Sequence, residues 1–147
     1  MNKKMLMIVA PLVLVILVGA GWMFLRPAPA APGDETKVPG PTHTLAEPFV
    51  VNLSDGGGPR FVKAGVALRL AKSSASMVVA GAGSEPATLE GEAQVRDIII
   101  RALKTRSSAD LATERGLDRL NADIIKKINK QTELRVLDIY YTEFAVQ

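Results

Sequence analysis

The sequence predicts an α+β domain that follows a single N-terminal transmembrane helix. An uncharged apolar run, Met5 to Leu25, is followed by a proline-rich stretch and then by residues 45–147, which carry strand and helix periodicities. The order of these periodicities is β-β-α-α-β, which is typical of helices packed on a small sheet. We therefore divide the chain into a cytoplasmic end (residues 1–4), a membrane helix (5–25), a linker (26–44) and a folded extracytoplasmic domain (45–147).

The composition excludes several functional classes. The 147 residues include no cysteine and one histidine. This excludes a disulfide framework, a cysteine-ligated zinc, a thiol nucleophile, a lipidated N-terminal cysteine and a metal site built from several histidines. The net charge is +3, from 18 basic and 15 acidic residues. Lys3 and Lys4 precede the apolar run, and the remaining 16 basic residues nearly balance the acidic ones, which excludes an electrostatic footprint for nucleic acid.

The run from Met5 to Leu25 has the length and composition of a membrane-spanning helix. At 1.5 Å per residue it would be roughly 31 Å long, close to the thickness of the hydrocarbon core of a bilayer. Lys3 and Lys4 precede it and only Arg26 follows, which predicts a cytoplasmic N-terminus and a single pass. The alternative is a signal peptide cleaved at Ala28-Pro29-Ala30, but the apolar run exceeds the roughly 7–15 residues typical of signal peptides.

Arg26 to Thr44 is predicted to be an extended or disordered spacer. It contains five prolines and almost no large apolar residue, so it buries too little surface to offset the entropy of ordering. Such a spacer would hold the domain away from the bilayer. His43, at its end, is expected to be a solvated linker residue rather than a catalyst or a ligand, because no partner residue lies nearby in the sequence.

Two β-prone runs open the folded domain. Leu45–Leu53 is the first, and Pro48 restricts it to a sheet edge or a strand start. Ser54–Pro59 contains three consecutive glycines and predicts a turn. In Arg60–Leu70, apolar residues alternate with polar ones, which predicts a hairpin with one buried face. The residues on that face are Val62, Ala64, Val66, Leu68 and Leu70.

Residues 71–92 are predicted to be a loop, since they contain several glycines and Pro86. The alternative for Met77–Val79 is a short extension of the preceding strand. Gly81-Ala82-Gly83 is a weak candidate for a phosphate-binding loop, because it lacks the spacing of a dinucleotide fingerprint and a following lysine.

Two amphipathic helices follow. In Glu92–Leu103 the apolar residues recur at helical spacing and face one side. Ser107 or Ser108 is expected to cap a short helical turn that ends near Gly116, a predicted C′ glycine. The next helix is defined by Leu117, Leu120, Ile124, Ile125 and Ile128. Charged residues on the outer faces of both helices are interpreted as solvated surface.

Leu134–Val146 is the strongest predicted strand because it is rich in β-branched and aromatic residues. Strict alternation places one set of apolar residues on one face, namely Val136, Tyr140, Phe144 and Val146. It places Leu137, Ile139 and Tyr141 on the other. A strand that is apolar on both faces is either central or reserves one face for another subunit. We therefore identify Leu137, Ile139 and Tyr141 as candidate contacts for an oligomer or a partner.

No residue pattern predicts catalysis. The candidate carboxylate pairs, Asp118 with Asp123 and Glu90 with Glu92, lie among lysines and arginines, which favours a solvated surface over a site with perturbed pKa values. Ser73, Ser74 and Ser76 lack a nearby base and a nucleophile elbow. Aromatic residues are too few to stack on nucleic-acid bases. We expect no catalytic residue, no metal and no cofactor.

Segments spread over residues 45–147 resemble the FliL family of flagellar basal-body proteins in their order and spacing. The architecture of a short N-terminal end, one apolar helix, a proline-rich spacer and an outer domain is also similar. Residues 71–92 depart from the family pattern in their content of Gly, Ala and Ser, and Tyr141 stands where phenylalanine is more usual. The segments are Phe49-Val-Val-Asn52-Leu53, Arg60-Phe-Val, Val95-Arg96-Asp97-Ile98-Ile99, Gly116 with Leu120, Ile128-Asn129, and Val136–Gln147.

This resemblance implies a function that the residues alone do not show. Proteins of the family are inner-membrane components of the bacterial flagellum, and their periplasmic domain resembles the stomatin/prohibitin (SPFH) fold. They associate with the ion-driven stator (MotA/MotB type), as rings around its periplasmic part, and support torque, swimming, swarming and hence chemotaxis. The resemblance implies a homo-oligomeric, non-enzymatic scaffold anchored by Met5–Leu25. The alternative is a tethered periplasmic binding or chaperone module of another envelope system.

Overall fold

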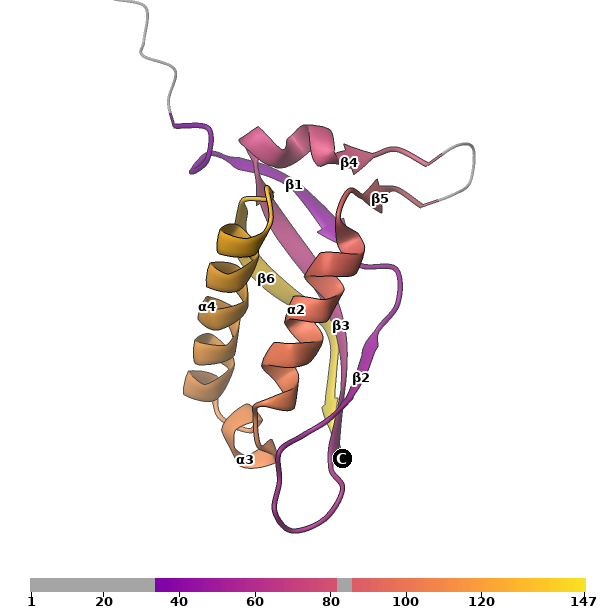
Figure 1. Cartoon of the computed structure of the whole chain (residues 1–147), viewed down its shortest axis with the longest axis vertical. Helices are drawn as coiled ribbons and strands as arrows, with labels where there is room; N and C mark the ends of the chain where they lie inside the picture. Colours follow the sequence, from indigo (N-terminus) through magenta and orange to yellow (C-terminus); the bar gives the residue numbers. More distant parts are fainter. Residues whose placement is uncertain (1–33, 82–85) are drawn as a thin grey trace, which may run out of the picture. The chain divides into compact units, whose positions relative to one another are not determined.

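A four-stranded antiparallel sheet carries two long helices on one of its faces (Figure 1). The computed structural model describes residues 34–81 and 86–147. The predicted α+β class is confirmed. In chain order the elements are β1 (Pro39–Thr44), β2 (Phe49–Asn52), β3 (Phe61–Ala71), the 3-10 helix η1 (Lys72–Met77), β4 (Val78–Val79), β5 (Thr88–Leu89), α2 (Glu92–Lys104), α3 (Ser108–Leu111), α4 (Glu114–Gln131) and β6 (Val136–Val146).

The centre of the sheet is β3, with which β1, β2 and β6 all pair. β6 runs antiparallel to it along nearly its whole length. The other side of β3 is shared by two shorter antiparallel strands, β2 along residues 61–64 and β1 along residues 67–71. The predicted hairpin is confirmed. Pro48 directly precedes β2, which lies at an edge of the sheet, where proline is tolerated.

The hydrophobic core lies between the sheet and the two long helices. The alternating residues predicted for the buried face of β3 are all 0–2% exposed, which confirms that prediction. Fully burying one side chain of this size contributes roughly 1.5–3 kcal/mol, so the core holds the helices on the sheet. The facing helix residues are Val95, Ile98, Ile99, Ala102 and Leu103 of α2 and Leu120, Ile124 and Ile128 of α4.

The domain begins earlier than predicted. Residues 39–44, assigned to the linker, form β1 and pair with residues 67–71 of β3. The prediction that His43 is solvated is wrong, because this residue is 5% exposed. The proline content of this stretch argued against a strand. The two prolines of β1 lie where the register with β3 shifts, so their missing N–H groups are tolerated there.

Parts of the predicted architecture lie outside the described residues. These are the cytoplasmic end, the proposed membrane helix Met5–Leu25, and residues 26–33 of the linker. Within residues 34–81 and 86–147, no helix combines the length and the apolarity needed to cross a bilayer.

Residues 72–79 are more ordered than the predicted loop. η1 separates β3 from Val78–Val79, so the alternative in which Met77–Val79 extends the preceding strand is wrong. Val78 and Val79 instead form β4, which pairs with β5 as a separate two-stranded sheet. The Gly81–Gly83 candidate for a phosphate loop falls largely outside the described residues.

The corner between α3 and α4 assigns Gly116 a different role from the predicted one. Ser107 caps α3, because its hydroxyl accepts a hydrogen bond from the N–H of Asp110 (3.1 Å). Gly116 does not end that turn as a C′ glycine but lies in the first turn of α4. The reason for glycine is space: an added Cβ would lie 2.6 Å from the carbonyl carbon of Asp110.

Two β-bulges change which residues of β6 face the core. The register with β3 skips Leu137 and then Thr142, so β6 has one extra residue at each point. Each bulge reverses the alternation of side chains along the strand. The predicted faces are therefore wrong for Tyr140, Ile139 and Tyr141, because the prediction assumed strict alternation. The core-facing residues of β6 are Val136, Ile139, Tyr141, Phe144 and Val146, and Tyr140 is 47% exposed.

Candidate functional site

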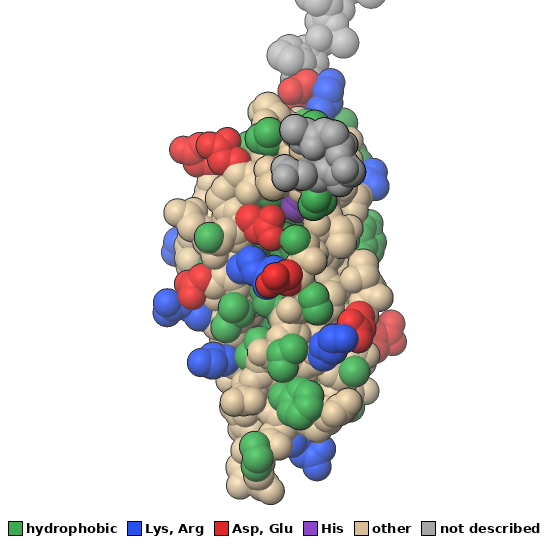
Figure 2. Space-filling model, turned by 90° about the vertical axis from the view of Figure 1, so that its right-hand side faces the viewer, with side chains coloured by type: hydrophobic (Ala, Val, Ile, Leu, Met, Phe, Trp, Pro, Cys, Tyr) green, Lys and Arg blue, Asp and Glu red, His purple; other side chains and the backbone are tan. Residues whose placement is uncertain are grey.

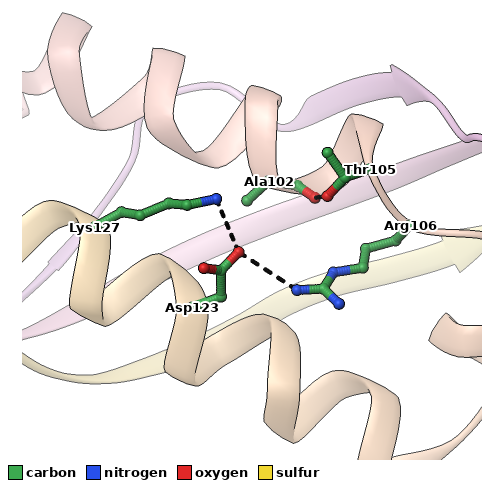
Figure 3. A network of polar contacts seen from close by, with 5 residues as sticks. All are labelled: Ala102, Thr105, Arg106, Asp123 and Lys127. Carbon is green, nitrogen blue, oxygen red and sulfur yellow. Dashed lines mark hydrogen bonds and ion pairs between the residues drawn. The ribbon is translucent and has the colours of Figure 1, made fainter.

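Asp123 takes part in a structural ion network. Its carboxylate accepts a hydrogen bond from Lys127 one turn further along α4 (2.9 Å). It also lies 3.4 Å from Nη2 of Arg106, which follows α2, and Figure 3 shows the carboxylate between the two cations. The hydroxyl of Thr105 in the same turn donates to the carbonyl of Ala102 (2.8 Å). This network joins the end of α2 to α4.

The other predicted carboxylates do not form acid–base pairs. Asp118 is exposed on α4, apart from the Asp123 network. Glu90 is exposed just before α2. Glu92 lies beside cationic or ionisable partners instead: its carboxylate is 3.6 Å from Nε2 of His43 and 3.9 Å from Nη1 of Arg96. His43 thereby joins β1 to the start of α2.

Of the three candidate serines, Ser74 is buried and Ser73 and Ser76 are exposed. Ser74 is 2% exposed, and its hydroxyl accepts a hydrogen bond from the N–H of Arg135 (2.8 Å), which fixes η1 to the start of β6. Within residues 34–81 and 86–147, no cluster of three or more histidine and carboxylate side chains has the geometry to hold a metal ion.

The pKa values of Asp55 and Tyr141 are shifted by their surroundings in the fold. The hydroxyl (2.7 Å) and the backbone N–H (2.8 Å) of Ser108 both donate to Asp55, and these hydrogen bonds lower the pKa of its carboxyl group. They fasten the loop between β2 and β3 to α3. Burial raises the pKa of Tyr141 to about 12. Its phenol donates a hydrogen bond to Oδ1 of Asn121 on α4 (2.6 Å).

The structure places the three candidate contact residues of β6 at different depths. Ile139 is 7% exposed and belongs to the core. Tyr141 packs against α4 of its own chain and against the ring of Phe144, whose centroid is 4.9 Å away. Leu137, at the first bulge, is half-buried. An oligomer contact through these residues stays a prediction.

The two edges of the sheet have backbone groups that are open to a further strand. In the described part of the chain, β6 pairs with β3 alone, and so does β2. Beside β2 lies a groove of about 400 Å³, which we call the β2–α2 groove; it is lined by residues 48–52 together with Arg96, Ile100 and Lys104. Figure 2 shows this side of the molecule, where hydrophobic side chains lie between charged ones.

Arg96 lines the β2–α2 groove and fixes β2 to α2. Its guanidinium lies 4.5 Å from the centre of the Phe49 ring. Its Nη1 donates to the carbonyl of Glu47 (3.0 Å) and approaches Glu92. Lys104, the last residue of α2, also lines the groove and is exposed. Pro48 indicated the edge position of β2 in the sequence, but nothing in the sequence showed that α2 would lie beside that edge.

Comparison with known proteins identifies the family. The family model for "Flagellar basal body-associated protein FliL" matches residues 42–147. The flagellar protein FliL of Aquifex aeolicus (strain VF5) is 28% identical over 106 residues. That alignment covers 71% of this chain and 60% of the Aquifex protein, so the chain matches a little over half of that relative's length. The predicted resemblance is confirmed, and the chain belongs to the FliL family of flagellar basal body-associated proteins.

Proposed function

We propose that this protein is a non-enzymatic scaffold of the flagellar motor, anchored in the bacterial inner membrane and associated with the stator. The observation that carries the proposal is the match of residues 42–147 to a basal-body family, in a chain whose residues Met5–Leu25 form an uncharged apolar run. Such a run is long enough to span a bilayer once, with its N-terminus in the cytoplasm. The domain would then lie in the periplasm.

The proposed mechanism is a shift of an existing equilibrium. A scaffold that binds the engaged stator more tightly than the free stator raises the engaged population by its difference in affinity, without any chemistry of its own. The described residues support this role, because Asp55, Ser74 and Asp123 make contacts that hold elements of the fold together. An SPFH-like arrangement of several copies would place many identical binding surfaces around one stator.

The proposed oligomer would use the outer edge of β6. An unpaired strand edge is a template for association with another chain. Leu137, a half-buried member of the predicted contact residues, lies on this strand. The natural chain has no cysteine, so a single Leu137→Cys substitution allows disulfide cross-linking in the native membrane without background. We expect a cross-linked dimer with Leu137→Cys and none with Lys126→Cys, an exposed position of α4.

Deletion of the gene tests the proposed function directly. We expect slower swimming at high viscosity and lower stator occupancy, with both restored by the complete chain. Val15→Arg should behave like the deletion, because an arginine at the centre of a membrane helix costs roughly 2.5–3.5 kcal/mol, whereas Val15→Leu should restore swimming. Unchanged swimming of the deletion strain under load would contradict the motor role. Recovery of partners from another envelope system in place of stator proteins would favour the alternative module.

A further inference from the structure

The outer edge of β2 carries hydrogen-bonding groups that no strand of the described chain uses. Phe61, the first residue of β3, exchanges two backbone hydrogen bonds with Gln147, which directly follows β6 (both 2.9 Å). Successive residues of a strand direct their backbone groups to opposite sides, so Val62 directs its groups to Val51, its partner on β2. The residues on either side of Val51, Val50 and Asn52, therefore direct their N–H and C=O groups away from β3, into the β2–α2 groove.

The side chains of the groove add apolar surface and positive charge to this edge. Ile100 of α2 contributes a half-buried apolar wall, and Val50 is 65% exposed at the rim. The lining includes two cations, Arg96 and Lys104, and no carboxylate. Arg96 already has Glu92 at 3.9 Å. Lys104 forms no ion pair with any described residue, so the free charge of the groove lies at its Lys104 end.

We propose that the β2–α2 groove binds an extended acidic segment of a partner protein. The segment adds as a strand to the outer edge of β2, pairs with the backbone of Val50 and Asn52, and places a carboxylate near Lys104. This mode of recognition takes affinity from main-chain hydrogen bonds and specificity from alternate side chains. The four residues of β2 span roughly 13 Å, so the paired part of the segment has about four to six residues.

Charge complementarity selects an acidic segment of another protein over segments of this chain. The acidic residues at the N-terminal end of the described part are already held elsewhere. Glu35 pairs with Lys72 (3.1 Å), and its carbonyl accepts a hydrogen bond from the N–H of Ser73 (3.3 Å), both in η1. A β6 edge from a second copy is the competing occupant, and the effect of Lys104→Glu on oligomers distinguishes it from an acidic partner. The inference goes beyond the proposed function, since it concerns a surface that the oligomer contact on β6 does not use.

A labelled model peptide tests the groove on the complete chain in detergent micelles. The probe is a fluorescein-labelled nonapeptide that alternates valine and glutamate, and the charge control alternates valine and lysine. We expect saturable binding of the acidic peptide by fluorescence anisotropy, at least tenfold tighter than that of the basic peptide at low salt. Amide resonances of Val50 and Asn52 should shift on titration, because their N–H groups change hydrogen-bonding partner.

Paired variants locate the binding determinants. Lys104→Glu should weaken the acidic peptide about tenfold at low salt, and the matched control Lys126→Glu, on the outer face of α4, should leave binding unchanged. Val50→Pro removes an outward N–H at an edge position where proline is tolerated, so the fold should persist while peptide binding is lost. Circular dichroism and thermal unfolding check the fold of each variant.

Three results would overturn the proposal. Equal binding of the acidic and basic peptides would show adsorption without recognition. Equal weakening by Lys104→Glu and Lys126→Glu would show an effect of net charge alone. Failure of the acidic peptide to bind, together with dissociation of oligomers by Lys104→Glu, would assign the groove to a second copy. None of these results depends on swimming, so they test the groove independently of the proposed role in the motor.

Discussion

The two free edges of the sheet are built differently. At the start of the β6 edge, one side chain of α4 takes the place of a neighbouring strand: Asn129 donates to the carbonyl of Val136 (3.0 Å) and accepts from its N–H (2.7 Å). At the β2 edge, α2 leaves a groove into which the backbone of Val50 and Asn52 points. An asparagine amide reproduces the donor and acceptor of a peptide group, so the start of β6 is satisfied within the chain.

This difference suggests that one edge of the sheet contributes to the stability of the fold and the other is available for binding a partner. Hydrogen-bonding groups that are satisfied internally contribute to folding, and removing their partner leaves a costly unpaired group. Groups that remain directed to solvent cost little when changed, but they are available to a partner. We therefore expect substitution of Asn129, at the start of β6, to affect unfolding and substitutions along the outer edge of β2 to affect binding.

The largest expected effect comes from the corner that positions α4 over β6. Gly116→Ala would place a Cβ 2.9 Å from the Thr113 hydroxyl and even closer to the backbone of Asp110. Because backbone has to move, we expect a loss of about 3 kcal/mol in the free energy of unfolding. Urea unfolding monitored by circular dichroism measures it. Arg115→Ala, an exposed change in the same turn, should stay within about 0.5 kcal/mol.

A comparison of two asparagines tests the edges directly. Asn129→Ala leaves both backbone groups of Val136 without their partner, so we expect a loss of about 2 kcal/mol in the free energy of unfolding. Asn52→Ala removes an exposed side chain from the β2 edge and should change that free energy by less than about 0.5 kcal/mol. Equal losses from the two substitutions in urea unfolding would abolish the distinction between the edges.

The smallest effect concerns the hydrogen bond between β6 and α4 at Tyr141. Tyr141→Phe keeps the ring packing and removes the bond to Asn121, so we expect a loss of about 1 kcal/mol. Tyr140→Phe, on the exposed residue beside it, is the control and should be neutral.

The pH dependence of the same tyrosine follows from its pKa. Burial raises the pKa of Tyr141 to about 12, from 10.0 in the unfolded chain. The folded state therefore holds the phenolic proton more tightly, and stability present below pH 10 should decline as the pH rises from 10 to about 12. Tyr141→Phe should flatten this decline in chemical unfolding followed across that range. An unchanged decline in the variant would show that other groups cause it.

The sequence predicted the elements that depend on regular periodicity. The alternating face of β3 and the apolar stripes of α2 and α4 were correct because strict spacing of 2 or 3.6 residues determines them. Predictions failed where a single residue breaks the spacing. The bulges at Leu137 and Thr142 exchange the faces of β6, and they depend on pairing with β3, which local sequence does not encode.

The candidate surface was harder to predict than the fold. The β2–α2 groove depends on a packing that brings residues 48–52 beside Arg96 and Lys104, and no periodicity connects these parts of the sequence. His43 shows the same limit, because its burial against Glu92 requires a strand in a proline-rich stretch. The family resemblance succeeded because the order of many short segments carries information that no single motif does.

The antiparallel pairing of β1 with β3 has a mechanical consequence. The chain passes from Asp34 through a turn at residues 35–38 into β1, whose direction is opposite to that of β3. When the domain is held at the opposite end of β3, a force that pulls on the N-terminal end of β1 loads its hydrogen bonds to β3 in shear, all at once, whereas a force across the strand would open them one after another. A domain tethered at this end would therefore resist tension from its tether before it begins to unfold.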